Sequence, residues 1–215
     1  MLVESQGVEI QGGTYYIFNR NQVRYDDVSG NNINYSIHLK KVRLVIMGNS
    51  DRLRRIVLAA MLLALCVVGA NIKIMGSIAF DSAPAFLGAI LLGPWFGAFL
   101  GIFGHLTSAA LSGFPLTLPV HLVVGFMMGV CMFVFGWIRQ RFGKDKFGVI
   151  LISDIVGYII NTPLEIPLLY PLLKGTIFAL FVPLTVATIF NIVIAEIVYA
   201  FLPKTMKHAN FLGSH

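Results

Sequence analysis

Five ionisable side chains lie within or beside long apolar stretches of this sequence, where a charge is costly and often has a function. They are Asp81, His105, His121, Asp154 and Glu165. Carboxyl and imidazole groups exchange hydrogen bonds and protons, so in apolar surroundings they could bind a small polar solute or relay protons. Ordinary structural roles are equally open: helix capping for Asp81, an interfacial position for His121 and ion pairing for Glu165.

The composition indicates what kind of element must carry these groups. The chain is 57% hydrophobic and 12% charged, with a mean hydropathy of +0.80, whereas soluble domains are about 25% charged. So little charge cannot cover a globular surface, which excludes a soluble enzyme and a disordered chain. The net charge of +6 comes from short basic clusters between apolar stretches. This pattern is typical of membrane topology rather than of nucleic-acid binding.

The apolar stretches predict an all-α integral membrane protein, a bundle of six transmembrane helices. The interval from Ser82 to Ile138 contains no Asp, Glu, Lys or Arg, and Gly93-Pro94 and the segment 112–115 divide it into three helices. We expect the helices at about 56–72, 79–93, 95–112, 118–138, 147–161 and 175–202.

The basic residues predict the orientation of these helices. Nine Lys and Arg flank them on one side, at 52–55, 139–146 and 204–207, against Lys73 and Lys174 on the other. Because cytoplasmic segments carry an excess of Lys and Arg, we expect both termini to be cytoplasmic. The segments 71–78, 112–119 and 162–175 then face outward. The predicted location is the cell membrane, which the chain crosses several times.

This orientation sorts the polar side chains by depth. An outer group could line an outward-facing pocket for a small polar solute; it contains Asp81, His105, His121, Asn161, Glu165 and Tyr170. An ion pair with Lys174 is the structural alternative for Glu165. Asp154 and Glu196 fall in the cytoplasmic half, where they could pair with the basic inner loop or bond between helices. Asn191, in the middle of its helix, is expected to bond a neighbouring helix.

Small residues recur at helical spacing in three places. Gly97-x-x-x-Gly101 and Gly125-x-x-x-Gly129 are expected to pack helices within the bundle, because such rows let two backbones approach closely. Ala60-x-x-x-Ala64 could pack in the same way or form a docking face for a partner. Cys66 and Cys131 both lie in apolar stretches and are expected to pack as small hydrophobic residues.

The first 46 residues differ from the rest of the chain. They are polar, with mixed charge and no helical apolar period. We expect a poorly ordered extension at 1–46, with a small β-rich domain as the alternative, followed by a membrane domain at 47–215. Met47 could be the physiological start, since Met-Gly-Asn-Ser-Asp-Arg leads directly into the first apolar helix.

Several catalytic and phosphate-binding motifs are absent from the sequence. It contains no Gly-x-x-x-x-Gly-Lys-Ser/Thr, His-Glu-x-x-His, Gly-x-Ser-x-Gly or Cys-x-x-Cys. The chain is therefore expected not to hydrolyse ATP by the phosphate-loop route. We predict no catalytic residue, no metal or cofactor, and no nucleic-acid partner.

Three short segments occur together in one order along the chain. Ala60-x-x-x-Ala64 is followed by Asp81-Ser-Ala-Pro84 and then by Gly93-Pro94-Trp-Phe-Gly97. With these segments, residues 52–204 resemble the substrate-binding S components of energy-coupling factor (ECF) vitamin transporters. The resemblance implies a subunit that binds a vitamin or its precursor at the outer face. It also implies that Ala60 and Ala64 dock onto a membrane T subunit that works with two ATPase subunits.

The segment from Gly104 to Leu116, followed by Pro119-Val-His121, is similar to S components assigned to α-ribazole, a cobalamin precursor. A ribosylated benzimidazole needs an aromatic face and hydrogen-bonding groups. The residues that could supply these groups are Phe80, Phe114, His121, Asn161 and Tyr170, and the same groups would suit several vitamins. Pantothenate or another vitamin stays open, because Lys73 or Lys174 could pair with a carboxylate. A secondary transporter or an integral-membrane enzyme is the alternative of another class.

Overall fold

The computed structural model describes strands and helices at 7–10, 14–19, 22–26, 32–34, 36–71, 73–74 and 78–79, and the chain from 81 to 207. Side chains are described for 52–70, 81–203 and 206–207. The chain divides into two units, Met1–Arg54 and Arg55–His215. Each unit is considered by itself below.

The first unit contains a four-stranded antiparallel sheet. Its strands are β1 (Gly7–Ile10), β2 (Thr14–Asn19), β3 (Gln22–Asp26) and β4 (Asn32–Asn34), in the order β1-β2-β3-β4. The register aligns Val8 with Tyr16, Tyr16 with Tyr25, and Tyr25 with Ile33. Aromatic and β-branched residues of this kind favour strands. The hypothesis that Met47 is the physiological start of the protein stays a prediction.

The first helix is longer than the sequence predicted. Helix α1 runs from Ser36 to Asn71 and so begins about 20 residues before the expected position near 56. Among the residues whose side chains are described, its segment Arg52–Ala70 is long and apolar enough to span a membrane, and hydropathy predicted that segment. The preceding residues contain no proline and several Leu, Lys, Arg and Met residues, which favour helix without being apolar as a group.

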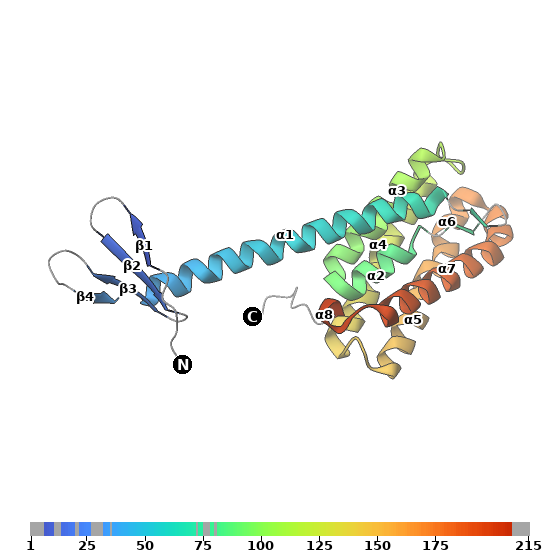
Figure 1. Ribbon diagram of the computed structural model, residues 1–215. Coiled ribbons are helices and arrows are strands. Elements are labelled where there is room, and N and C mark those ends of the chain that lie inside the picture. Colours follow the sequence, from blue (N-terminus) through green and yellow to red (C-terminus); the bar gives the residue numbers. More distant parts are fainter. Residues whose placement is uncertain are drawn as a thin grey trace. The chain divides into compact units, whose positions relative to one another are not determined.

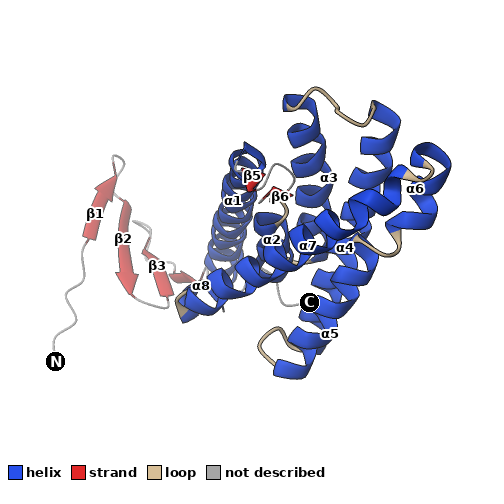
Figure 2. Cartoon of the chain, turned by 90° about the vertical axis from the view of Figure 1, so that its right-hand side faces the viewer, coloured by secondary structure: helices blue, strands red, loops and turns tan. Residues whose placement is uncertain are grey.

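The remaining helices are α2 (Ala83–Leu92), α3 (Pro94–Leu111), α4 (Leu118–Phe142), α5 (Phe147–Asn161), α6 (Glu165–Leu173), α7 (Thr176–Phe201) and α8 (Lys204–Lys207). Of these, α2 to α5 and α7 lie close to their predicted positions, whereas α6 and α8 were not predicted (Figure 1). The short strands β5 (Lys73–Ile74) and β6 (Ile78–Ala79) pair between α1 and α2, and Figure 2 shows them in red among the blue helices.

Glycine and proline set the helix boundaries, as the sequence predicted. Helices α2 and α3 separate at Gly93, whose φ of 94° is a left-handed value that a side chain would disfavour. Two boundaries differ from the prediction. Helix α2 begins at Ala83 rather than 79, since Pro84 is suited to the first turn of a helix. Helix α4 continues to Phe142 rather than ending at 138, so Arg139 lies inside a helix.

Four segments among the described residues are long and apolar enough to cross a membrane. They are Arg52–Ala70, Leu118–Phe142, Phe147–Leu173 and Thr176–Phe201. The third segment combines α5 with α6. Helix α6 lies within 162–175, a segment that the sequence predicted to be an outward connection. Helix α2 has ten residues, which is less than a spanning helix needs.

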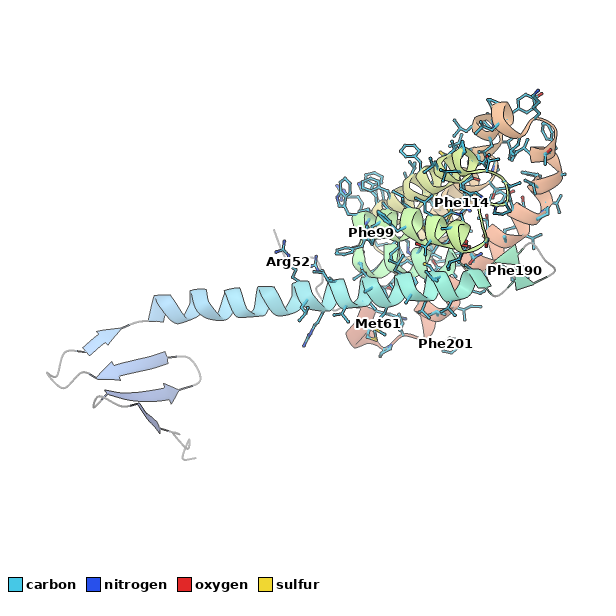
Figure 3. All side chains as sticks on the ribbon, turned by 90° about the horizontal axis from the view of Figure 1, so that it is seen from above. Arg52, Met61, Phe99, Phe114, Phe190 and Phe201 are labelled. Carbon is cyan, nitrogen blue, oxygen red and sulfur yellow. The ribbon has the colours of Figure 1, made fainter. Side chains whose placement is uncertain are left out.

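The short helix α2 is the centre of the second unit. Nine of its ten residues are buried, and it contacts α3, α4 and α7. Phe86 of α2 packs edge-to-face against Phe135 of α4, with ring centroids 5.0 Å apart. Apolar side chains also cover the outside of the bundle. Met61, Phe99 and Phe201 are 60%, 45% and 86% exposed and project outward in Figure 3, as lipid-facing side chains would.

The start of α2 is completed by a side chain from a distant helix. Ser82 precedes α2 but makes no side-chain capping bond. Instead, Asn191 of α7 accepts a hydrogen bond from the Ala83 N–H at 2.8 Å. Its own amide nitrogen donates to the Ala187 carbonyl at 2.8 Å. This confirms the expectation that Asn191 bonds a neighbouring helix.

The glycine rows bring helices into close contact, as predicted. A Cβ atom on Gly101 of α3 would lie 2.8 Å from the Met128 carbonyl oxygen of α4. A Cβ atom on Gly129 of α4 would lie 2.6 Å from the Ile102 side chain. Gly97 approaches α2, where its Cβ would lie 2.6 Å from the Ala89 Cβ and 2.9 Å from the Ala89 Cα. Only glycine allows backbones to approach this closely.

We predict that Gly97→Ala destabilises the bundle by about 1–3 kcal/mol, because the added methyl group overlaps the α2 backbone. The measurement is the free energy of unfolding in detergent micelles. Gly148→Ala is the matched control, since a Cβ atom there would meet nothing within 4 Å. It should cost nothing and could add up to about 1 kcal/mol through helix propensity. Equal stability of the two variants would contradict the close α2–α3 contact.

Candidate functional site

One end of the second unit is formed by the α3–α4 loop and the starts of α4 and α7, with α6 packed against them (Figure 1). Its apolar cluster consists of Val120, Leu169 and Ile177, with Leu116 and Ile166 at its border. We call this region the α6 end. It contains most of the predicted site residues.

Two histidines and a phenylalanine form the first polar group at the α6 end. His105 Nε2 of α3 and His121 Nδ1 of α4 share a hydrogen bond at 3.2 Å. Phe114 of the connecting loop lies beside His121, with ring centroids 5.8 Å apart. His121 is 8% exposed and its Nε2 atom has no hydrogen-bond partner. That nitrogen can therefore serve a bound molecule as donor or acceptor, depending on the tautomer.

The junction of α5 and α6 provides a second polar group. Asn161 Nδ2 donates to Thr188 Oγ1 of α7 at 2.9 Å, and Thr162 Oγ1 shares a hydrogen bond with the same hydroxyl at 2.9 Å. Both threonines are buried, at 1% and 3% exposure. The Asn161 Oδ1 atom is buried without a partner. One side of this amide is therefore held by the protein, and the other side is available to accept a hydrogen bond.

Glu165, the first residue of α6, is 2% exposed. Its backbone N–H donates to the Thr162 carbonyl at 3.2 Å, and its carboxyl group interacts electrostatically with the thiol of Cys131 in α4. The Oε1 atom is buried and has no hydrogen-bond partner. Among the described residues, Glu165 forms no ion pair with Lys174, which is exposed at the other end of α6. The ion pair with Lys174, which was the structural alternative for Glu165, is therefore not formed among the described residues.

Asp81 lies in the connection before α2, partly buried between α1 and α3. Its carboxyl group accepts hydrogen bonds from the Asp81 and Ser82 backbone N–H groups and from the Ser108 side chain of α3. Its carboxyl group also interacts electrostatically with Cys66 of α1. Asp81 thus links the elements around the start of α2.

The predicted site residues do not all come together. The His105–His121–Phe114 group and the Asn161 group are each assembled, but no described contact joins one to the other. Tyr170 is 51% exposed and packs edge-to-face on Phe178. Phe80 lies outside the described residues.

Sequence analysis missed two buried hydroxyl groups at the α6 end, those of Thr162 and Thr188. A signal for Thr188 was present: Thr185, Thr188 and Asn191 follow at intervals of three on a mainly apolar helix, which places them on one face. All three side chains bond to other elements. Thr185 shares a hydrogen bond with the Tyr158 hydroxyl of α5 at 3.4 Å, Thr188 bonds Thr162, and Asn191 bonds the Ala83 N–H. A row of this kind marks the buried face of α7.

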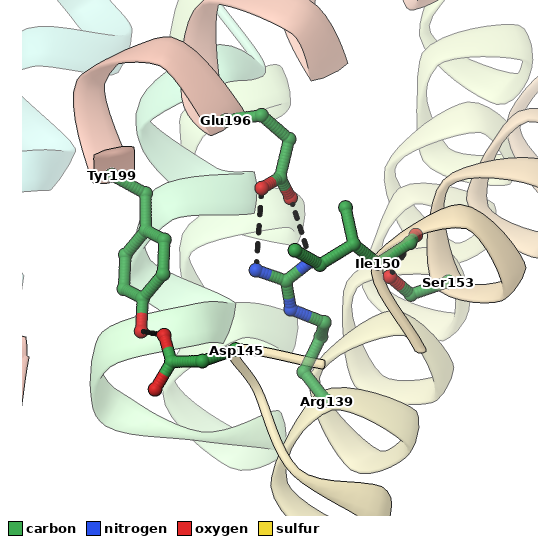
Figure 4. Close-up of polar contacts among 6 residues, drawn as sticks. All are labelled: Arg139, Asp145, Ile150, Ser153, Glu196 and Tyr199. Atoms are coloured by element: carbon green, nitrogen blue, oxygen red, sulfur yellow. Dashed lines mark hydrogen bonds and ion pairs between the residues drawn. The ribbon is translucent and has the colours of Figure 1, made fainter. Parts of the chain in front are cut away.

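At the opposite end, a buried ion pair joins α4 to α7 (Figure 4). Arg139 is fully buried, and its two terminal nitrogens reach the Glu196 carboxylate at 2.9 Å and 3.2 Å. The guanidinium also lies over the rings of Phe135 and Tyr199. This pairing is one of the two roles expected for Glu196. It corrects the assignment of Arg139 to the basic loop, because the longer α4 turns this residue inward.

The loop after α4 and the segment after α7 meet around this ion pair, in a region that we call the α8 end. The Tyr199 hydroxyl donates to Asp145 Oδ1 at 2.7 Å, and Lys207 Nζ lies 4.9 Å from the Tyr199 ring centroid. Lys144 Nζ donates to the Lys207 carbonyl. Burial lowers the pKa of Lys144, an effect that nearby Asp145 opposes. Polar groups at this end are therefore largely bonded to one another.

We predict that Glu196→Ala destabilises the protein by about 3–5 kcal/mol, because it leaves the Arg139 charge buried without a partner. The double variant Arg139→Met/Glu196→Leu should recover most of this loss, since it removes both charges. Unfolding in detergent micelles measures both effects. Lys146→Ala, at an exposed position, is the control and should change stability by less than about 0.5 kcal/mol. A double variant as unstable as Glu196→Ala would count against the ion pair.

The two residues of the predicted docking row lie on the outside of the bundle. Ala60 and Ala64 of α1 are both exposed, while Ala59, Leu62 and Cys66 turn toward the core. Exposed Met61 and Leu65 flank the two alanines. The row therefore does not serve packing within the described unit.

Comparison with known families agrees with the resemblance found in the sequence. A family model described as "ECF transporter, substrate-specific component" matches residues 54–203, well over half of the chain. No curated protein and no solved structure matches the chain. The matching family is a transporter component rather than an enzyme, and it works on a small-molecule substrate with an ECF T subunit and ATPase subunits. The chain belongs to the family of substrate-specific components of ECF transporters.

Proposed function

We propose that this subunit binds a vitamin or vitamin precursor at the α6 end, with α-ribazole as the substrate that fits best. The observation that carries the proposal is a set of three buried polar atoms without partners: His121 Nε2, Asn161 Oδ1 and Glu165 Oε1. Buried polar atoms are normally hydrogen-bonded, and leaving one unpaired costs about 1–3 kcal/mol. A bound polar solute would provide the missing partners.

In this proposal the chain crosses the cell membrane six times, with both termini in the cytoplasm and the α6 end facing outward. Three features support it. The basic residues Arg141, Lys144, Lys146 and Lys207 gather at the α8 end, which fits the positive-inside rule. The exposed apolar side chains surround the bundle. Helix α3 has 18 residues, enough to cross a thin bilayer, and α2 would cross only together with the connection that precedes it.

The choice of α-ribazole depends on matching its two parts to the polar groups. A benzimidazole ring could stack on Phe114 or His121, whose rings lie side by side. Ribose hydroxyl groups could donate to Asn161 or Glu165. Phe80 and Tyr170 are further candidates from the sequence, and Asp81 and His105 would hold the surrounding elements. Pantothenate is the second candidate, for which Lys73 or Lys174 would provide the cation.

We expect α-ribazole to raise the melting temperature of the purified chain in detergent. At 100 times its dissociation constant, a ligand that binds only the folded state stabilises by about 2.7 kcal/mol. His121→Ala and Asn161→Ala should each weaken α-ribazole binding at least tenfold, because each removes a hydrogen-bonding group. Lys73→Ala is the control and should leave α-ribazole binding unchanged. Loss of binding with the lysine variant alone would favour an anionic vitamin instead.

We further propose that Ala60 and Ala64 form the surface that docks on the T subunit. Small residues at this spacing allow a partner helix to approach the α1 backbone closely. Both alanines are exposed, and the buried face of α1 is formed by other residues. The surface is therefore free to receive a helix from another subunit.

The double variant Ala60→Phe/Ala64→Phe should reduce co-purification of the T and ATPase subunits at least tenfold, because two bulky rings would hold the partner helix away. The stabilisation by α-ribazole should be retained. Ala179→Phe on α7 is the matched control, since it adds the same ring at another exposed alanine. If the control and the double variant lose the partner subunits equally, the docking surface is not specific to α1.

A further inference from the structure

A pair of histidines joins α3 to α4 at the α6 end. The Nε2 atom of His105 lies 3.2 Å from the Nδ1 atom of His121, and the two ring centroids are 5.3 Å apart. A hydrogen bond between two ring nitrogens needs one proton, so one ring donates it and the other accepts it. The contact therefore links the position of the proton on one ring to its position on the other.

Both rings of the pair are neutral. Within the part of the chain whose side chains are described, the ion pair is that of Arg139 with Glu196, and neither histidine has a carboxylate within ion-pair distance. His121 is 8% exposed, with the Phe114 ring beside it. Burying an imidazolium group without a counter-charge is unfavourable. Because a neutral imidazole has one N–H group, the pair has two arrangements of its protons.

The two arrangements differ at the Nε2 atom of His121, which is buried without a hydrogen-bond partner. If His105 donates to the contact, the proton of His121 lies on this atom, and the protein buries an N–H group that has no acceptor. If His121 donates from Nδ1, its Nε2 atom is a bare acceptor, and the proton of His105 lies on Nδ1 of a ring that is only partly buried. A buried N–H group without a partner is rarer in proteins than an acceptor without one. The second arrangement is therefore favoured.

We infer that His105 is a positioning residue: by accepting the Nδ1 proton of His121, it keeps His121 Nε2 as an acceptor, so the substrate must place an O–H or N–H group there. The inference rests on the proposed function, because it concerns the same binding site. It narrows how α-ribazole would bind. A hydroxyl group, rather than the ring nitrogen that carries no proton, would face His121, and the benzimidazole ring would be left to Phe114.

The first test determines the tautomer of His121 in the full-length chain without substrate. Nitrogen-15 NMR of histidine-labelled protein in detergent distinguishes a protonated from an unprotonated ring nitrogen. The spectrum of His121→Gln identifies the His121 signals among those of the five histidines. We expect a protonated Nδ1 atom and an unprotonated Nε2 atom. A proton on Nε2 would overturn the inference.

Two variants of His105 separate its proposed role from packing. His105→Gln offers an amide oxygen that can accept the Nδ1 proton, so it should retain the tautomer of His121 and change α-ribazole binding by less than threefold. His105→Leu fills similar space without an acceptor. It should shift His121 toward the form with a proton on Nε2 and weaken α-ribazole binding at least tenfold. Phe103→Leu, which removes an exposed ring from the same helix, is the control and should leave both properties unchanged.

The requirement for a donor is tested with methyl ethers of α-ribazole, each with one hydroxyl group blocked. One ether should bind the wild-type chain at least tenfold more weakly than α-ribazole, because its oxygen can no longer donate to His121. This preference should fall below threefold in His105→Leu and be retained in His105→Gln. A preference that comes only from the size of the methyl group would be the same in all three chains, and that result would contradict the donor requirement.

The outcomes distinguish this inference from the function on which it rests. Equal α-ribazole binding by the two His105 variants would overturn the role of His105 and leave the proposed substrate standing. If α-ribazole does not bind the wild-type chain, the proposed substrate fails and its donor requirement fails with it, whereas the NMR spectra still decide whether His105 fixes the tautomer. A melting temperature for each variant shows that the chain is folded.

Discussion

Every polar atom inside this bundle must find its partner within the protein or in a bound solute, because lipid offers no hydrogen bonds. The start of α2 shows how far the chain goes to meet this constraint. Its first N–H group is bonded by Asn191, a residue 108 positions away. Without that contact, a short helix that is buried on nearly all sides would have an unpaired donor in its apolar core. This amide group therefore adds a polar contact to the apolar packing of α7 against α2.

The two ends of the bundle meet the same constraint in different ways. At the α8 end, Arg139 is paired with Glu196, and Tyr199 is bonded to Asp145, although Arg139 Nε and Asp154 Oδ1 have no hydrogen-bond partner. At the α6 end, bonded groups alternate with the unpartnered atoms of His121, Asn161 and Glu165. The α6 end has unpartnered atoms from three different elements and no ion pair among the described residues, which is the physical reason to propose the binding site there. This arrangement also fits a subunit of an ECF transporter, which receives its substrate and leaves ATP hydrolysis to other subunits.

Close packing makes this division possible. Glycines on α3 and α4 allow the two helices to contact each other and α2 with almost no space for side chains. Because the interior is filled in this way, the larger polar side chains are confined to the two ends and to the buried face of α7. On the outside of α1, by contrast, the small residues Ala60 and Ala64 are exposed. This exposed small-residue face supports a role for the two alanines in assembly.

Hydropathy and the positions of glycine and proline were sufficient to predict the membrane class and the positions of α2 to α5 and α7 to within a few residues, but not α6. The family resemblance depended on short motifs such as Asp81-Ser-Ala-Pro84. These are local properties, and they act over one helix or one turn. They failed where a helix continues past its apolar part, as at the start of α1 and the end of α4. The pairing of polar groups could not be predicted in this way. Arg139 meets Glu196 across 57 residues, and Glu165 is left without Lys174, only because the helices pack side by side. Which polar atoms are bonded and which remain available is decided by tertiary structure, since a hydrogen bond depends on distances in space.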